Sequence, residues 1–157
     1  GSIVIWTFGD LSKTNWSIIL IQLMLLSPSC LILLKDGIKF NALDAGDQVA
    51  ASLGVDVKKF RMQSMLLASF ITATVVAFYG IIAFVGLVIP HIVRLLAGNE
   101  SRYLFTASMV SGAVFLLLSD LLSRNLYHPL VIPVGIITSI VGAPLFVLLL
   151  IRGKKRW

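Results

Sequence analysis

The sequence is poor in charge, cysteine and histidine. Charged residues make up 13% of its 157 residues, with 7 acidic side chains and 2 histidines, whereas a soluble domain has about 25% charged residues. Cys30 is the only cysteine, so an internal disulfide is impossible. Two histidines do not supply a Ser-His-Asp or Cys-His arrangement, and the sequence has no phosphate-binding loop motif. These shortages argue against a disulfide scaffold and an ordinary soluble enzyme, and we expect no catalytic residue, metal site or cofactor.

Apolar residues are abundant instead. They make up 58% of the chain, and the mean hydropathy is +0.98, the opposite of a disordered sequence. The net charge is +6, but nucleic-acid binding requires such charge to be gathered on one face of a folded domain. Here the basic residues flank apolar stretches, so we expect a membrane protein with no nucleic-acid partner.

Apolar stretches with almost no charge predict the membrane spans, because about 20 apolar residues cross the hydrocarbon core. They cover residues 17–34, 62–93, 103–123 and 133–151. The second would form about 48 Å of helix, too long for one upright span and too short for two. Breaks are available at Gly80, Gly86 and Pro90, and we predict a span ending near Gly80, a sharp turn, and a short helix over 83–97. The expected fold is an all-α, polytopic bundle of about five membrane helices, with the pair at 62–97 and short cytoplasmic helices.

The basic residues favour one orientation of this bundle. With residues 1–16 outside the cell, the inner segments include 35–61 and the tail 152–157, and the outer segments hold only Lys13 and Arg124. The inner segments hold Lys35, Lys39, Lys58, Lys59, Arg61, Arg94, Arg102, Arg152, Lys154, Lys155 and Arg156. This positive-inside bias predicts a multi-pass protein of the cell membrane, embedded in the lipid bilayer.

The tryptophans agree with this orientation. Trp6 and Trp16 fall at the outer interface and Trp157 at the inner one, where aromatic anchors are typical. Gly1 and Ser2 resemble a cloning remnant, and we expect the chain to be the rear part of a longer membrane protein.

The polar segment 35–61 is long enough to fold by itself. We predict a short helix within residues 41–54 with Asp44 as its N-cap, and Asp47 favours the positive end of the helix dipole. Gly54 suits the left-handed position just past the helix, and a second helix would start at Val57. The segment is either a plain connector or a docking element for a cytoplasmic partner.

Several motifs carry a resemblance to one family. The sequence reads NALDAGDQVAASLG at 41–54 and AFVGLVIPHIVR at 83–94, followed by PVG at 133–135 and GAP at 142–144. In this order they resemble the FecCD-type permeases, the membrane subunits of ABC importers for iron-siderophores, haem and cobalamin. The resemblance covers nearly the whole chain but only the C-terminal half of a family member.

The resemblance implies roles for particular residues. It implies alternating access driven by an ABC ATP-binding subunit, which would contact a coupling loop made of Asp44, Asp47, Ala50, Ala51, Ser52, Leu53 and Gly54. It also implies that Arg124 faces an extracytoplasmic substrate-binding protein and that a second permease copy completes a homodimer. The permease itself would bind no ATP. The family often has Glu-Leu-Pro where this sequence has Val131, Ile132 and Pro133, so any role of that glutamate is absent or moved.

Asp120 and Arg124 are spaced i, i+4 and can pair on one helix face. A charge close to a membrane is costly unless it is paired or hydrated, so the pair is either a structural closure of the helix end or also a docking site, and the two roles can coexist.

The last span has a stripe of small residues at Gly135, Ser139 and Ala143, which allows close helix packing. By the resemblance, Thr138 and Ser139 line the translocation path, with packing as the alternative. For His91 and His128 we expect packing and interface hydrogen bonds. The rival functions are a divalent-metal ABC permease and a small channel or intramembrane protein.

Overall fold

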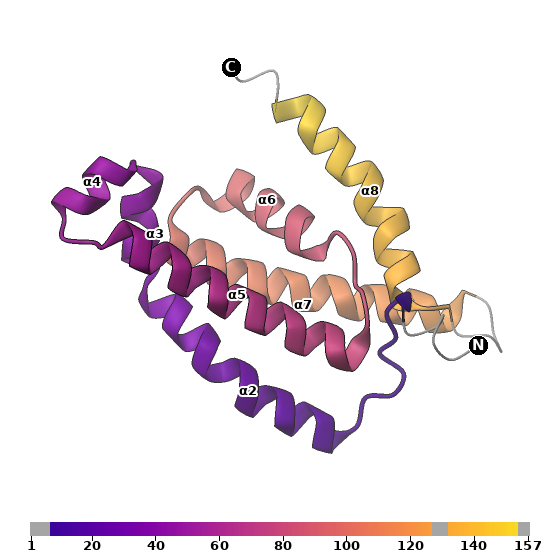
Figure 1. Ribbon diagram of the computed structural model, residues 1–157. Helices are drawn as coiled ribbons and strands as arrows, with labels where there is room; N and C mark the ends of the chain where they lie inside the picture. The colour runs from indigo at the N-terminus through magenta and orange to yellow at the C-terminus, as the bar shows by residue number, and fades with distance from the viewer. Residues whose placement is uncertain (1–6, 127–131, 154–157) are drawn as a thin grey trace.

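A computed structural model describes residues 7–126 and 132–153, and all regular structure in these ranges is helical (Figure 1). The helices are α2 (Trp16–Lys35), α3 (Gly37–Asp44), α4 (Asp47–Ser52), α5 (Val57–Tyr79), α6 (Val85–Ala97), α7 (Ser101–Asn125) and α8 (Val134–Gly153). The predicted all-α class is confirmed. Trp6, His128, Val131, Lys154, Lys155, Arg156 and Trp157 lie outside the described residues.

Four of the described helices, α2, α5, α7 and α8, are long and apolar enough to cross a membrane. The other predicted membrane helix, α6, is apolar but has only 13 residues, about 20 Å of helix. The chain turns at Gly80, where φ is +78°, which is where the sequence predicts the break. Pro90 does not break the chain and lies inside α6.

The membrane helices run back and forth between two ends of the bundle. The ends of α2 and α6 and the starts of α5 and α7 lie together at the end that carries α3 and α4 (Figure 1). We call α3, α4 and the link to α5 the knob, and the end of the bundle that carries it the knob end. The basic segments at 35–61 and 94–102 therefore share one end, as the charge pattern requires.

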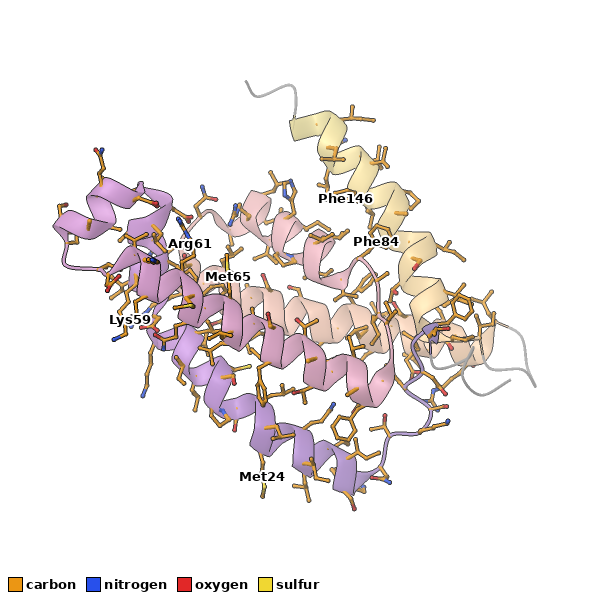
Figure 2. All side chains as sticks on the ribbon, in the orientation of Figure 1. Met24, Lys59, Arg61, Met65, Phe84 and Phe146 are labelled. Atoms are coloured by element: carbon orange, nitrogen blue, oxygen red, sulfur yellow. The ribbon has the colours of Figure 1, made fainter. Side chains whose placement is uncertain are left out.

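Several polar side chains lie inside the bundle, and many large apolar side chains are exposed on its outside. The buried residues of α2 are Gln22 and Ser29, whereas Met24 is 75% exposed and points away from the bundle (Figure 2). A small apolar core joins α6 to α7 through Ile89, Val93 and Leu104. This arrangement suits a lipid solvent, because hydrocarbon tolerates exposed leucine and methionine but disfavours unpaired polar groups.

A short helix that ends before Gly54 is present within 41–54 as α4 (Asp47–Ser52), but the predicted N-cap is wrong. The chain forms two helices, and Asp44 is the last residue of α3 rather than an N-cap. The break falls at Gly46, the N-cap of α4, whose φ of +115° is available at low cost only to glycine. Gly54 has a φ of +83°, the left-handed conformation predicted for it.

At the end opposite the knob, backbone segments approach one another closely. The amide of Asp10 donates to the carbonyl of Tyr79 at 2.8 Å, and the amide of Gly135 donates to the carbonyl of Gly9 at 3.4 Å. A Cβ added at Gly135 would overlap the Phe8 carbonyl and lie 2.8 Å from the Ile81 oxygen. Glycine at 135 therefore allows α8 to start against the segment before α2 and the α5–α6 link.

Phe84, just before α6, has a φ of +67°, the one positive value among non-glycine residues of the described chain. Its side chain packs where a Cβ on Gly142 would be, 3.0 Å from the Phe84 Cγ. The ring centroids of Phe84 and Phe146 are 6.4 Å apart, and both residues are labelled between α6 and α8 in Figure 2. The small residue at 142 thus leaves room for the ring that joins α8 to the start of α6.

Candidate functional site

The knob is the polar segment in which most of the candidate residues lie. Ala50 is completely buried, and its carbonyl accepts a hydrogen bond from the Val55 amide at 3.0 Å. The side chain of Ala50 therefore holds α4 against its neighbours and cannot contact a partner directly. Asp44, Asp47, Ala51, Ser52, Leu53 and Gly54 are exposed.

An aromatic cluster fixes α3 to two membrane helices. The ring of Phe40 lies 4.9 Å from that of Phe60 on α5 and 5.2 Å from that of Phe105 on α7, measured between centroids, both edge-on. The Nζ of Lys39 lies 5.5 Å from the Phe60 centroid, a cation–π distance. These rings are far apart in the sequence, and sequence analysis did not identify the cluster.

Two polar contacts tie the knob to the helices below it. The Ser101 amide, at the start of α7, donates to the Asn41 Oδ1 on α3 at 2.8 Å. On the other side, an Arg61 nitrogen on α5 lies 3.0 Å from an Asp47 oxygen at the start of α4. Both side chains of this ion pair are more than half exposed, so the pair orients α4 more than it stabilises the fold.

α4 stands between two grooves and exposes apolar side chains at Val49 and, just past its end, at Leu53. Val49 is 44% exposed and Leu53 68% exposed. One groove, of about 730 Å³, runs between α4 and the side of α5 that carries Arg61 and Met65. The other, of about 620 Å³, lies toward α3 and includes Leu53 and Lys59, and Figure 2 labels Lys59 on the opposite side of α5 from Arg61 and Met65. A short helix projecting between two hollows has the shape of a docking element.

The predicted pair of Asp120 and Arg124 is present near the end of α7, opposite the knob. The Arg124 Nε lies 2.8 Å from the Asp120 Oδ2, and the arginine side chain remains 50% exposed. One residue earlier, the Ser123 hydroxyl donates to the Ile132 carbonyl, which joins α7 to the segment leading into α8. The guanidinium is therefore oriented by its carboxylate partner and still accessible.

The two path candidates on α8 differ. Thr138 is completely buried and its hydroxyl donates to the Gly135 carbonyl at 3.1 Å, an arrangement typical of packing. The Ser139 hydroxyl donates to the same carbonyl at 2.7 Å, but the residue is only partly buried. Of the two, Ser139 is better placed to meet a path.

Within the described residues no group of three or more His, Cys, Asp or Glu side chains could hold a metal ion. His91 is exposed on α6.

The fold defines a class: a polytopic membrane bundle whose helices carry a polar, two-helix knob at one end. The chain matches the FecCD transport family over residues 1–152. It belongs to that family and is a multi-pass membrane protein.

Named relatives support the same family. The chain is 36% identical to the hemin transport system permease protein HmuU of Yersinia pestis, over 97% of this chain and 46% of that protein. It is 40% identical to the vitamin B12 import system permease protein BtuC of Vibrio vulnificus, over 94% of this chain and 44% of BtuC. It is also 40% identical to the Fe(3+) dicitrate transport system permease protein FecD of Escherichia coli, over 95% of this chain and 47% of FecD. The chain thus spans about half the length of the curated relatives it matches.

A solved structure has the same helix arrangement. It is a metal-chelate type ABC transporter in an inward-facing conformation, with a TM-score of 0.89 and 34% sequence identity over 96% of this chain and 49% of that chain. All of these relatives are transport proteins and none is named as an enzyme.

Proposed function

We propose that this chain serves in the membrane-spanning subunit of an ATP-driven importer, which moves a metal chelate or corrinoid across the cell membrane by alternating access. The observation that carries the proposal is the shape of the knob, in which α4 presents Val49 and Leu53 between two grooves. Relatives named for hemin, vitamin B12 and ferric dicitrate supply the substrate class. The chain performs no covalent chemistry in this scheme, and ATP is hydrolysed by a separate subunit.

The exposed face of α4 is where the ATP-binding subunit docks. Leu53 and Val49 supply apolar contact area, and Asp47, Ala51, Ser52 and Gly54 surround them with small or polar groups that a cleft can accommodate. Ala50 does not meet the partner itself, but its burial keeps α4 in the orientation that docking requires. Asp44 closes α3 next to the turn at Gly46.

Motion of the docked subunit reaches the membrane through the contacts beneath the knob. The Phe40 cluster joins α3 to α5 and α7, and the Asp47–Arg61 pair joins α4 to the first turns of α5. A shift of α4 therefore tilts α5 and α7 rather than bending the loop alone. Tilting of packed helices about an interface is a common form of such transitions.

The opposite end receives the substrate from an extracytoplasmic binding protein. Arg124 is half exposed and its guanidinium is held by Asp120, so it can offer a positive charge to a carboxylate of that protein. A second permease copy pairs with this one, and Ser139 contributes to the path between the halves, with Thr138 packed behind it.

The docking role of α4 is tested by placing charge on its exposed face. In the full-length permease, Leu53→Arg is expected to reduce co-purification with the ATP-binding subunit by about tenfold, because a central apolar contact contributes about 1–2 kcal/mol or more. Asn99→Arg is the matched control, since it adds the same residue to the exposed α6–α7 link at the same end. Unchanged co-purification of the Leu53 variant, or an equal loss in the Asn99 variant, would remove α4 from the docking surface.

A further inference from the structure

A separate cleft lies between two membrane helices at the knob end. It has a volume of about 310 Å³ and is lined by Leu31, Leu34 and Lys35 from the last turns of α2 and by Arg102 and Thr106 from the first turns of α7. Two cationic side chains thus stand over two leucines and a threonine. The docking and path residues discussed above do not line it.

Neither cation of this cleft has an anionic partner in the described part of the chain. The ion pairs there join Lys39 to Asp36, Arg61 to Asp47 and Arg124 to Asp120. Asp36, next to Lys35, is thus engaged by Lys39 at 2.7 Å. Glu100 precedes α7 without forming an ion pair within the described residues. Within the described residues, the two cations of the cleft therefore form no direct ion pair.

Arg102 is positioned rather than free. A Cβ added to Gly37 would lie 2.6 Å from the Arg102 Cγ, so the stem of the arginine lies directly over the buried glycine at the start of α3. The Ser101 amide is bonded to Asn41, and the Thr106 hydroxyl donates to the Arg102 carbonyl at 3.0 Å. The first turn of α7 is thereby fixed beside the end of α2.

The depth of the cleft suits a lipid headgroup. Lys35 is the last residue of one candidate span and Arg102 the second residue of another, so both charges lie where hydrocarbon gives way to headgroups. Leu31 and Leu34 lie up to one turn deeper along α2, at the level of the acyl chains. A basic pocket between membrane helices, with apolar residues beneath it, matches the charge and polarity of an anionic lipid.

We infer that this cleft binds an anionic phospholipid of the leaflet at the knob end, with the lipid phosphate between Lys35 and Arg102 and an acyl chain along Leu31 and Leu34. Both cations donate charge-assisted hydrogen bonds to the phosphate, and arginine can do so with two N–H groups. The bound lipid bridges α2 and α7, which have few direct contacts. The site is independent of the docking of α4.

Lipid titration of the full-length permease tests this inference. The purified protein is titrated in detergent with phosphatidylglycerol or phosphatidylcholine of the same acyl chains, and bound lipid is counted by native mass spectrometry. Phosphatidylglycerol is expected to bind about tenfold more tightly than phosphatidylcholine, and the double variant K35Q/R102Q is expected to lose that preference. Inorganic phosphate at millimolar concentration is expected not to displace the lipid, because the leucines contribute to its binding.

The matched control is the double variant K58Q/K59Q, which removes two positive charges from α5 at the same end and is expected to keep the preference within about twofold. Equal loss in this control would show a general surface charge effect and overturn the site. Equal binding of the two lipids by the wild-type protein, or displacement by phosphate alone, would overturn the lipid assignment. If K35Q/R102Q does not elute as one species, K35Q alone carries the test, with an expected loss of about threefold.

Discussion

The two ends of the bundle are held together in different ways. At the knob end, long side chains make the contacts: Phe40 reaches Phe60 and Phe105, and Arg61 reaches Asp47. At the opposite end, backbone meets backbone, and Gly135 starts α8 against the carbonyls of Phe8 and Ile81. The first kind of contact can yield by side-chain rotation, whereas the second has no room to yield. Under the proposed docking of α4, the side-chain contacts lie at the end that meets the partner, and the close backbone contacts lie at the opposite end.

The largest expected effect is at the opposite end. Gly135→Ala should destabilise the folded state by about 3 kcal/mol, because the new Cβ would overlap a carbonyl that cannot move away cheaply. The measurement is the thermal unfolding midpoint of the detergent-purified permease. Gly86→Ala is the control, since nothing lies within 4 Å of its added Cβ and the residue is helical, so a small gain in stability is expected from helix propensity. If both variants have the same unfolding midpoint, the close backbone contact at Gly135 does not stabilise the end opposite the knob.

A middle-sized effect is expected from the aromatic cluster. Phe40→Ala removes both edge-on ring contacts and should cost about 2 kcal/mol, because Phe40 is only partly buried. The same variant should make the knob more sensitive to limited proteolysis while cleavage elsewhere stays unchanged. Phe70→Ala on α5 is the matched control, because that ring is 46% exposed. General destabilisation without faster cleavage of the knob would contradict a local anchoring role.

The smallest expected loss of stability is at Gly54, where glycine is needed for its positive φ and not, as at Gly135, for lack of space. Gly54→Ala should cost about 1 kcal/mol from its positive φ alone, since its added Cβ meets nothing within 4 Å. Gly54→Asn should recover part of this loss, because asparagine tolerates the left-handed conformation. Asparagine at 135 should recover nothing, because space and not conformation is limiting there. Chemical denaturation of the four variants measures the difference, and a rescue at 135 as large as at 54 would contradict it.

The sequence predicts the features that local chemistry decides. The break after Tyr79 follows from Gly80 within an overlong apolar stretch, and the pairing of Asp120 with Arg124 follows from their spacing on one helix. Both depend on residues that are close in the chain, so a pattern can identify them.

Features that depend on distant residues were missed. Residues 41–54 favour helix on both sides of Gly46, so the local pattern permits a break at that glycine but does not decide where α4 begins. Phe40 and Phe105 meet only because α3 folds back onto α7. The crowding at Gly135 likewise depends on Phe8, which is remote in sequence.

The backbone conformation of Phe84, at the start of α6, depends on the position of α8. A left-handed conformation costs a residue with a side chain about 1–2 kcal/mol, and Phe84 keeps it beside the bare surface of Gly142. Withdrawal of α8 would remove that support and let the backbone at 84 relax to an ordinary conformation. The backbone conformation at Phe84, and with it the direction in which α6 starts, therefore depends on α8 being packed against it.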